Sequence, residues 1–511
     1  MKYIKGFFSR AGVVATCVII QIVWSYIVII GFSQYSTIIS IILRLVSILV
    51  VLGMIKREKN VTNNLPWMFI IILAPVFGGL MYLICGANFY TSPTIKKLNL
   101  TRNKLNSFLI QDKRIIEEIE KQDESIASQI KYISNYSNYP IYKNKNGLIK
   151  YFKLGDEVYP EIIENLKKAK KFIFIEFFII ERGKFWDSIL EVLEQKVKEG
   201  VDVRIIYDDI GCAWTLPYHY DRFLESKGIK CVVFNRMIPL MAVFMNNRDH
   251  RKILDIDGDV AFSGGFNLAD EYINEVEKYG HWKDNAIMIK GEPVWNYTIM
   301  FLKTWNTFRK NDNKHYEYYR PTKNYSRRRN DGFIEPYGEN PLDNENIGEN
   351  IYLNILNQAK KYVHIFTPYL IIDSELSTAL ALAVKRGVSV KIVTPGIPDK
   401  IIVNQLTKSY YYDLIKEGVE IYEYTPGFIH SKVFVSDDKV ATVGTLNLDY
   451  RSLYTHFECG NYIYDASVIK DIKDDTDETI KKSQKITINE LKHGFFKEVF
   501  QSMLRIFAPL L

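Results

Sequence analysis

Two stretches of the chain carry one signature: HRKILDIDGDVAFSGGFN at residues 250–267 and HSKVFVSDDKVATVGTLN at residues 430–447. In each copy a His and a Lys stand two residues apart, an Asp follows the Lys by five residues, and a glycine-containing turn ends in Asn. Side chains two apart in a strand point to one face, so each His–Lys pair can converge on one ligand. The glycines permit a close backbone approach, and the Asn supplies an amide donor.

The sequence upstream of each signature is duplicated as well. Apolar, strand-like stretches recur in the same order, at 169–180, 198–209 and 227–235 in the first copy and at 359–372, 385–396 and 417–427 in the second. Helix-like stretches lie between them, for example at 186–198 and 374–385. Apolar strands that alternate with helices predict an α/β fold, built as an internal duplication, whose sheets are covered on both faces.

Three apolar runs, at residues 12–32, 36–54 and 65–86, precede the duplication. About 20 apolar residues cross a bilayer core, so we expect an N-terminal membrane anchor of two or three transmembrane helices. A cleaved signal peptide would not be followed by two further apolar runs. Basic residues flank the first two runs and follow the third, and Arg44 lies inside the second. The number of spans and the side of the membrane that carries the active site therefore stay open.

These patterns divide the chain into a membrane anchor at 1–92, a connector at 93–140, and two repeats at 141–320 and 321–511. The tract at 309–345 is rich in charge, Asn and Tyr, which is typical of a linker or surface excursion. The last stretch, 491–511, has apolar residues at helical spacing. We favour a helix that caps the core here, with a helix on a membrane surface as the alternative.

Charge and cysteine content narrow the classes of function. The net charge of +7 suits an anionic partner, either a lipid surface or nucleic acid, and does not choose between them. The five cysteines are scattered and form no CxxC pair: Cys17, Cys85, Cys212, Cys231 and Cys459. Neither a disulfide framework nor a structural zinc site is therefore indicated.

The paired signatures suit phosphoryl chemistry. A neutral imidazole can attack phosphorus, a second can protonate the leaving oxygen, and lysines and amides can hold the phosphate oxygens. Because no carboxylate cluster with metal-ligand spacing accompanies the signatures, we expect neither a metal nor a cofactor. A single such His is more often structural, but two copies at equivalent places of a repeat make chance a poor explanation.

At these residues the chain closely resembles the phospholipase D superfamily, and within it the bacterial cardiolipin synthases. The stretches that carry the resemblance are 250–272, HWKD at 281–284, TPYLIID at 367–373, and 421–458. The resemblance implies a core of two pseudo-twofold-related phospholipase D-like repeats, with both histidines in one cleft between them. It also implies a multi-pass protein of the bacterial cell membrane that acts on phosphatidylglycerol and other membrane lipids.

The resemblance further implies roles for the signature residues. His250 would attack phosphatidylglycerol, form a phosphatidyl-histidine and expel glycerol. His430 would protonate that glycerol and then deprotonate a hydroxyl of a second phosphatidylglycerol, so that the product is cardiolipin. The reverse assignment of the two histidines stays open because the motifs are nearly symmetric. Phosphate oxygens would be bound by Lys252, Lys432, Asn267 and Asn447.

Four carboxylates complete the expected site. Asp284 and Glu458 are the candidates for orienting His250 and His430, in that order, since an imidazole needs a partner to fix its tautomer. Asp257 and Asp437 complete the two catalytic motifs, and we expect them to support the structure rather than to carry protons. Two positions depart from the family pattern: an Asp at 249 and a His at 456 stand where Asn is usual.

Other functions remain as alternatives. A phospholipase D hydrolase or another phosphatidyltransferase would differ only in which acceptor resolves the intermediate. A nuclease is disfavoured by the three apolar runs and by the lack of a dense basic stripe with interleaved aromatics, so we expect no nucleic acid partner. A non-catalytic scaffold is disfavoured because every signature residue is present twice. The sequence leaves open whether the chain forms a homo-oligomer.

Overall fold

The computed structural model of the protein describes residues 19, 22–23, 26, 36–57, 64–82, 92–145, 148–236, 247–309, 315–323, 325, 328–343, 345–491 and 494–510. The chain divides into two units. The first combines Met1–Ser92, Asn235–Asn246 and Phe495–Leu511, and the second contains Pro93–Phe234 and Asn247–Gly494. Both signatures lie in the second unit.

The first repeat is built on a seven-stranded sheet of order β2-β9-β7-β6-β3-β4-β5. Its strands are β2 (Ile149–Phe152), β3 (Phe172–Phe177), β4 (Asp202–Asp208), β5 (Lys230–Phe234), β6 (Lys252–Ile256), β7 (Val260–Gly264) and β9 (Ala286–Lys290). Strands β3, β4 and β5 are parallel, whereas β6, β7, β9 and β2 pair antiparallel. The helices are α9 (Gly155–Lys167), α10 (Lys184–Lys198), α11 (Tyr220–Ser226) and α12 (Val294–Phe308), with the 3-10 turn η5 (Asp270–Ile273).

The second repeat is built on a nine-stranded sheet of order β1-β10-β17-β16-β15-β11-β12-β13-β18. Its strands are β1 (Tyr142–Lys145), β10 (Asn330–Glu339), β11 (Tyr362–Phe366), β12 (Ser389–Pro395), β13 (Glu420–Tyr424), β15 (Val433–Ser436), β16 (Val440–Gly444), β17 (Glu458–Tyr464) and β18 (Ser483–Lys485). The helices are α13 (Ile347–Gln358), α14 (Ser374–Lys385), α15 (Ile401–Lys416), α16 (Tyr450–Tyr454) and α17 (Val468–Lys481), with the 3-10 turn η7 (Ile488–Leu491). The turn η6 (Tyr316–Tyr319) packs on the first repeat, where Arg204 donates to the hydroxyl of Tyr319. Parallel β11, β12 and β13 repeat the arrangement of β3, β4 and β5.

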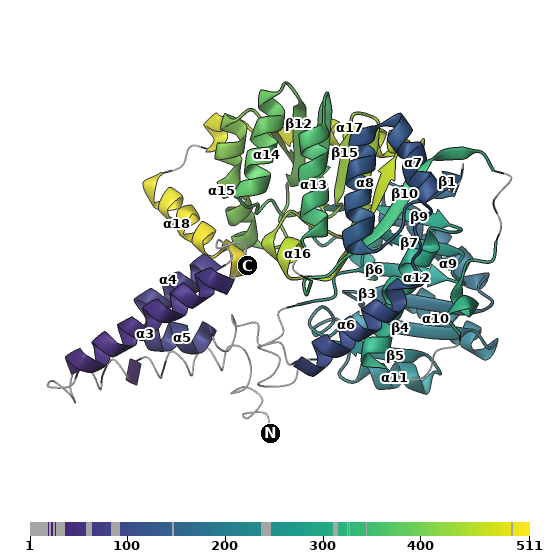
Figure 1. The fold of residues 1–511 in the computed structure, drawn as a ribbon, viewed down its shortest axis with the longest axis horizontal. Coiled ribbons are helices and arrows are strands. Elements are labelled where there is room, and N and C mark those ends of the chain that lie inside the picture. The colour runs from purple at the N-terminus through teal and green to yellow at the C-terminus, as the bar shows by residue number, and fades with distance from the viewer. Residues whose placement is uncertain are drawn as a thin grey trace. The chain divides into compact units, whose positions relative to one another are not determined.

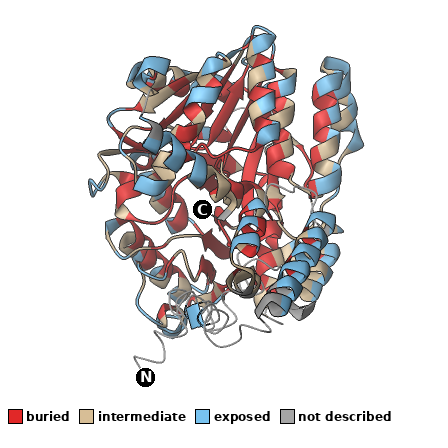
Figure 2. Cartoon of the chain, turned by 90° about the vertical axis from the view of Figure 1, so that its left-hand side faces the viewer, coloured by how far each residue is buried: buried red, intermediate tan, exposed pale blue. Residues whose placement is uncertain are grey.

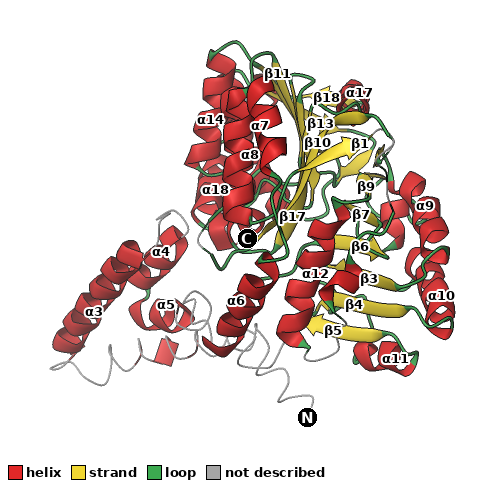
Figure 3. Ribbon diagram, turned by 45° about the vertical axis from the view of Figure 1, so that its right-hand side comes forward, coloured by secondary structure: helices red, strands yellow, loops and turns green. Residues whose placement is uncertain are grey.

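Three layers of apolar side chains hold these elements together. Alternation along β3 sends Phe172 and Phe174 to one face and Ile173 and Ile175 to the other. The first face joins a central core with α12, α17 and strands of the second sheet, while the other face packs on α9 and α10. A third core lies between the second sheet and α13 and α14. Figure 3 shows strands between α14 on one side and α9 and α10 on the other, and Figure 2 shows buried residues concentrated on the strands. The predicted α/β fold of two covered repeats is confirmed.

The expected connector packs onto the second repeat. It forms α6 (Ser92–Asn106), α7 (Lys113–Gln122) and α8 (Glu124–Ser137). Helix α8 contributes Ile126, Ile130 and Ile133 to the core under the second sheet and lies beside α13 (Figure 1). Strand β1 then enters the second sheet beside β10, whereas β2 enters the first beside β9. Consecutive strands of the chain therefore belong to different sheets.

The first unit contains the described part of the expected membrane anchor. Its elements are α3 (Ser36–Arg57), α4 (Leu65–Leu73), α5 (Pro75–Met81), α18 (Phe495–Ile506) and η8 (Ala508–Leu510). The third apolar run is not one helix, because Pro75 lacks the amide hydrogen that would continue α4 and begins α5 instead. A Cβ on Gly78 would lie 2.6 Å from the carbonyl oxygen of Ile70, so glycine is what lets α5 approach α4 closely.

The first apolar run, 12–32, lies almost entirely outside the described residues. Among the residues that are described, no helix combines the length and the apolar character needed to cross a membrane. The C-terminal helix α18 clusters with the N-terminal helices rather than with the repeats, and Phe507 contacts Phe69 of α4 edge-on at 6.1 Å. Within the first unit, the C-terminal end of the chain therefore packs against an N-terminal helix.

Candidate active site

The backbone places the two signature histidines symmetrically. His250 stands just before β6, and its amide donates to the carbonyl of Phe457 at 2.9 Å. His430 follows the short strand β14 (Gly427–Ile429), and its amide donates to the carbonyl of Lys283 at 2.7 Å. Strand β14 pairs in parallel with β8 (His281–Lys283), so a strand of each repeat joins the two motifs. Each histidine is thus anchored to the residue that precedes a carboxylate of the other repeat.

The carboxylates that orient the histidines are crossed between the repeats. Nδ1 of His250 lies 2.8 and 2.9 Å from the two carboxylate oxygens of Glu458, and Nδ1 of His430 lies 2.7 Å from Oδ2 of Asp284. The expected assignment was the reverse, Asp284 with His250 and Glu458 with His430, and it is wrong. The cause is the pairing across the repeats, which the linear order of the motifs does not reveal. An Nδ1–H that donates to a carboxylate leaves Nε2 free to act as nucleophile or base.

Burial and neighbouring cations keep both imidazoles neutral. Burial, with the positive charge of Lys432 and the opposing influence of Asp284, lowers the pKa of His430 to about 4. Burial, Lys252 and further cations lower the pKa of His250 well below its usual value. A neutral imidazole is the form that can attack phosphorus. His430 and Lys432 both contribute to the shift at His250, so the two motifs lie close enough to act on each other.

The two lysines are buried beside the histidines. Nζ of Lys252 donates to the carbonyl of His250 at 2.7 Å. Nζ of Lys432 donates to the carbonyl of His430 and lies 2.9 Å from Nδ1 of the same residue. Burial lowers the pKa of Lys252 to about 8 and that of Lys432 to about 7. Each signature therefore holds an ammonium group with a spare hydrogen for an anionic ligand.

The turns after the two motifs differ in a way that makes the half-sites unequal. A Cβ on Gly265 would lie 2.0 Å from Oδ1 of Asp284, so only glycine fits there. Thr445 takes the equivalent place in the second copy, and its hydroxyl donates to Oε2 of Glu458. Burial alone would raise the pKa of Asp284, but His430 and Lys432 hold it below the usual value for Asp. Burial raises the pKa of Glu458 well above the usual value for Glu.

The two signature asparagines already have partners. Oδ1 of Asn267 accepts from the amide of Ile179 at 3.1 Å, and its Nδ2 donates to the hydroxyl of Tyr272 at 2.7 Å. Nδ2 of Asn447 donates to Asp449 at 3.0 Å, while its buried Oδ1 has no hydrogen bond among the described residues. One amide hydrogen remains on each side chain, so binding of phosphate by both asparagines stays a prediction.

The signature aspartates lie at the far end of their strands. Five-residue β6 separates His250 from Asp257, a length of about 16 Å at 3.3 Å per residue. The carboxylate of Asp257 accepts from the amides of residues 170–172, and that of Asp437 accepts from the amides of residues 360–362. Both aspartates have positive φ, 58° and 55°. They fasten turns and make no contact with the histidines, so a catalytic role for them is not supported.

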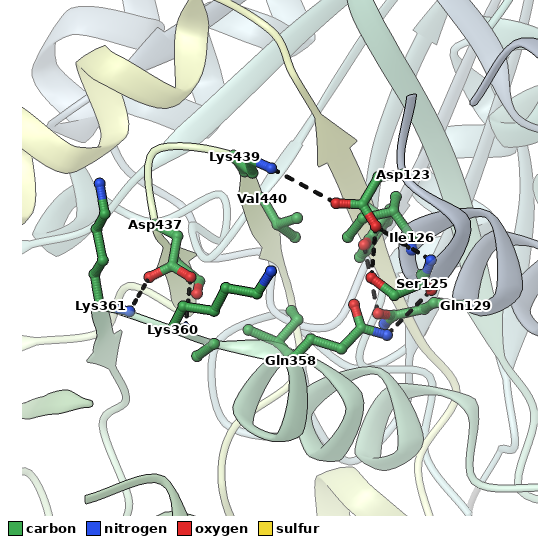
Figure 4. A pocket seen from close by; sticks show the side chains of 14 residues that line it. Asp123, Ser125, Ile126, Gln129, Gln358, Lys360, Lys361, Asp437, Lys439 and Val440 are labelled. Carbon is green, nitrogen blue, oxygen red and sulfur yellow. Dashed lines mark hydrogen bonds and ion pairs between the residues drawn. The ribbon is translucent and has the colours of Figure 1, made fainter. Parts of the chain in front are cut away.

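Figure 4 shows where Asp437 lies instead. Its carboxylate borders a cavity of about 260 Å³ that is also lined by α8 residues such as Ser125 and Gln129. In the figure the carboxylate accepts hydrogen bonds from the backbone amides of Lys360 and Lys361, just before β11. This cavity is at the opposite end of β15 from Lys432 and is separate from the paired histidines.

Several aromatic side chains complete the site without having been predicted. Phe178 stands edge-on to His250 with 5.0 Å between ring centroids, and Tyr272 stands edge-on to His430 at 5.4 Å. Trp282 lies 5.8 Å from the His430 ring. Trp282 belongs to the HWKD stretch at 281–284, so the sequence marked this residue as part of a motif. The spacing within that motif did not predict its contact with His430. Aromatic rings therefore lie close to both histidines.

Asp249, which precedes His250 in the sequence, has two polar partners. Asp249 accepts from Nε of Arg251 at 2.9 Å, and its amide donates to Asp208 at 3.1 Å. Arg251 in turn lies 2.8 Å from buried Glu176, so the carboxylate at 249 belongs to a charged network behind His250.

Comparison with known proteins gives the family. The family described as "Cardiolipin synthase, PLD-like domain" matches residues 162–300 and 352–480, which span the two repeats. An uncharacterized protein of Streptococcus mutans is 42% identical over 90% of this chain and 99% of its own length. A cardiolipin synthase of Alkalihalophilus pseudofirmus is 30% identical over 89% of this chain and 90% of its own. The crystal structure of a Haemophilus influenzae phosphatidylserine synthase shares the fold, with a TM-score of 0.56 at 18% identity, over 75% of this chain and 98% of the other.

Proposed function

The chain belongs to the family of cardiolipin synthases with phospholipase D-like domains, and on that basis we propose that it transfers a phosphatidyl group from one phosphatidylglycerol to another. Glycerol is released and cardiolipin is formed. The observation that carries the proposal is the crossed pair of contacts, His250 with Glu458 and His430 with Asp284. Two oriented, buried imidazoles that influence each other are what a double displacement at phosphorus requires.

In the first half-reaction Nε2 of His250 attacks the phosphorus of phosphatidylglycerol. The P–N bond forms, the P–O bond to glycerol breaks, and the proton on Nε2 of His430 passes to the glycerol oxygen. Bound phosphate brings the negative charge that favours the protonated form of His430. Lys252 and Lys432 hold the phosphate oxygens, because each keeps a hydrogen beyond its carbonyl contact.

In the second half-reaction a hydroxyl of another phosphatidylglycerol attacks the phosphatidyl-histidine. Nε2 of His430 takes the hydroxyl proton, the new P–O bond forms, and the P–N bond to His250 breaks. Both imidazoles return to their starting protonation states, so the cycle is balanced in atoms and charge.

The unequal half-sites support His250 as the nucleophile. Asp284 keeps a low pKa beside His430, so its negative charge is available to stabilise an imidazolium, which is the general acid. Glu458 beside His250 has a raised pKa and an additional donor in Thr445. That environment favours a neutral His250, as a nucleophile requires.

Burial of the site favours transfer over hydrolysis. His250 and His430 are each 7% exposed, and aromatic rings lie against both. A site that excludes water lets the alcohol of a second lipid compete for the intermediate. A phospholipase D hydrolase remains the alternative, and the products of the reaction distinguish the two.

We also propose that the first unit attaches the enzyme to the cell membrane as a multi-pass anchor. Supporting this, apolar side chains of α3 and α4 are exposed, among them Leu45, Leu49, Ile72 and Leu73 at 55 to 67%. Exposed apolar surface of this extent on neighbouring helices suits lipid as the solvent. Extraction from membranes by alkaline carbonate tests the proposal, because an anchored chain stays in the pellet whereas a peripheral one is released.

The test of the activity is product analysis with purified full-length enzyme and phosphatidylglycerol vesicles. We expect cardiolipin and free glycerol in equal amounts, and neither product with His250→Ala. Phosphatidic acid as the sole lipid product would show a hydrolase instead. Cleavage of DNA with no lipid turnover would overturn the proposal entirely.

A further inference from the structure

One buried histidine beside the catalytic pair is not used by the proposed mechanism. The ring of His456 lies 5.6 Å from that of His250, between centroids, and its side chain is 10% exposed. Neither of its nitrogens has a hydrogen bond among the described residues, and Nδ1 lies 3.8 Å from Oε1 of Glu458. Its backbone amide donates to the carbonyl of Arg451 at 2.9 Å, which fixes the residue. Two unused polar atoms therefore lie at the reaction centre.

The surroundings of His456 determine what it can bind. Burial and the charges of Arg451, Arg248 and Lys252 lower its pKa well below the usual value, so the ring is neutral. A neutral imidazole has one N–H donor and one acceptor nitrogen. A phosphate oxygen only accepts hydrogen bonds, so it can pair with the N–H of the imidazole but not with the acceptor nitrogen. A hydroxyl both donates and accepts, so it can pair with either nitrogen. A hydroxyl group therefore matches both nitrogens of His456.

We propose that His456 binds a hydroxyl of the glycerol head group and sets the preference of the enzyme for a polyol over a simple alcohol. The inference rests on the proposed transfer between phosphatidylglycerol molecules. Glycerol occupies the place beside His250 twice in that cycle, first as the leaving group and then as part of the attacking lipid. An Asn or Gln amide at this position would also offer both a donor and an acceptor.

A bound cation is the competing occupant. His250, His456 and Glu458 each offer one ligand atom, and these atoms lie within 4.8 Å of one another. However, Lys252, Arg248 and Arg451 surround the same place with positive charge, which opposes a second cation. Glu458 is also already in contact with Nδ1 of His250. The electrostatics therefore favour the neutral hydroxyl.

The experiment is a competition between two acceptors with a donor that contains no glycerol. Purified full-length enzyme receives phosphatidyl-p-nitrophenol with equal concentrations of glycerol and ethanol, and the ratio of phosphatidylglycerol to phosphatidylethanol is measured. The variants are His456→Leu, His456→Asn and His456→Gln, with His364→Leu as a matched control. His364 is equally buried in β11 and bonds Thr476, away from the paired histidines.

We expect His456→Leu to lower the product ratio at least tenfold, His456→Asn or His456→Gln to recover most of it, and His364→Leu to leave it unchanged. An unchanged ratio in His456→Leu would overturn the inference, as would loss of both products in equal proportion. If zinc inhibits the wild-type enzyme and His456→Asn abolishes this inhibition, the site beside His456 binds a cation instead. If wild type makes no cardiolipin from phosphatidylglycerol while the ratio still depends on His456, the proposed function fails and the inference stands.

Discussion

Glu458, from the second repeat, holds Nδ1 of His250, from the first, at 2.8 Å across 208 positions of sequence. In the same way, Oδ2 of Asp284, from the first repeat, lies 2.7 Å from Nδ1 of His430, from the second. Neither repeat therefore contains a complete catalytic unit, although each contains a complete sequence motif. Each histidine contacts a carboxylate of the other repeat because strands pair between the repeats. These pairs are β8 with β14 and the bridge of Asp249 with Phe457.

Replacing either orienting carboxyl group by an amide should impair chemistry more than folding. We expect Asp284→Asn and Glu458→Gln each to lower kcat by about 10²- to 10⁴-fold, because the amide no longer fixes the tautomer of its histidine. Glu335→Gln is the matched control: Glu335 is equally buried but bonds Ser134, and kcat should be retained. Steady-state kinetics with circular dichroism checks the result. Equal losses in all three variants would mean that the carboxylates act through stability alone.

The roles of the two histidines can be separated by trapping the intermediate. Phosphatidyl-p-nitrophenol has a leaving group that needs no general acid, so His430→Ala should still be phosphatidylated but should turn over slowly. We expect one p-nitrophenol per enzyme in a rapid burst, and mass spectrometry should place the phosphatidyl group on His250. His250→Ala should show no burst. A burst in His250→Ala with the adduct on His430 would exchange the two roles.

The dependence of kcat/KM on pH should reflect the buried lysines. Lysines whose pKa is lowered to about 7 and about 8 carry charge only below those values, so phosphate binding weakens as the pH rises through that range. We expect kcat/KM to fall above pH of about 7 to 8. The acid limb should lie well below the usual histidine range, because protonation of His250, whose pKa burial lowers, removes the nucleophile. Lys432→Arg keeps its charge and should move the alkaline limb upward. An alkaline limb that Lys432→Arg leaves in place would exclude Lys432 as its origin.

A methyl group at Gly265 should displace the carboxylate that orients His430. The added Cβ would lie 2.0 Å from Oδ1 of Asp284, so Gly265→Ala should lower kcat by at least tenfold and destabilise the fold by about 1–3 kcal/mol. Gly200→Ala is the control. Its φ of 87° is unfavourable for alanine, at roughly 1 kcal/mol, but open space surrounds it and kcat should not change. Thermal unfolding and kcat are measured on both, and a normal kcat in Gly265→Ala would contradict the geometry.

The signature aspartates should matter for stability and not for chemistry. Asp437→Ala removes the acceptor of three backbone amides, so we expect a loss of about 1–3 kcal/mol in unfolding free energy with kcat per folded molecule retained. Asp438→Ala, at the exposed neighbour, should cost less. Chemical denaturation provides the measurement. A large loss of kcat at unchanged stability would give Asp437 a direct role in the reaction.

Much of this arrangement is accessible from sequence because strand periodicity is local. The predicted strands at 169–180, 198–209 and 227–235 contain β3, β4 and β5. The convergence of His250 and Lys252 on one ligand stays a prediction. The separation of Asp257 from the histidine also follows from the length of one strand. The break at Pro75 was visible in the sequence as well, and treating the run at 65–86 as one span overlooked it.

The partner of each histidine could not be derived in this way. Strands β8 and β14 have three residues each, too few to show a periodicity, and their pairing joins segments about 146 residues apart in the chain. The contact of His456 with His250 depends on another long-range pairing, the bridge of Asp249 with Phe457. Local pattern therefore identified the candidate reactive groups, whereas the strand pairs between the repeats determine which of these groups lie in contact.

Strand β1 is synthesised well before β10, the strand with which it pairs, and this order has a consequence for folding during translation. Tyr142–Lys145 leaves the ribosome long before Asn330–Glu339, the strand it pairs with, so β1 must wait unpaired while the whole first repeat is translated. Glu458 emerges later still. A nascent chain already held at a membrane by its N-terminal segment would thus meet lipid substrate without a working nucleophile, and it would gain one only when translation was nearly finished.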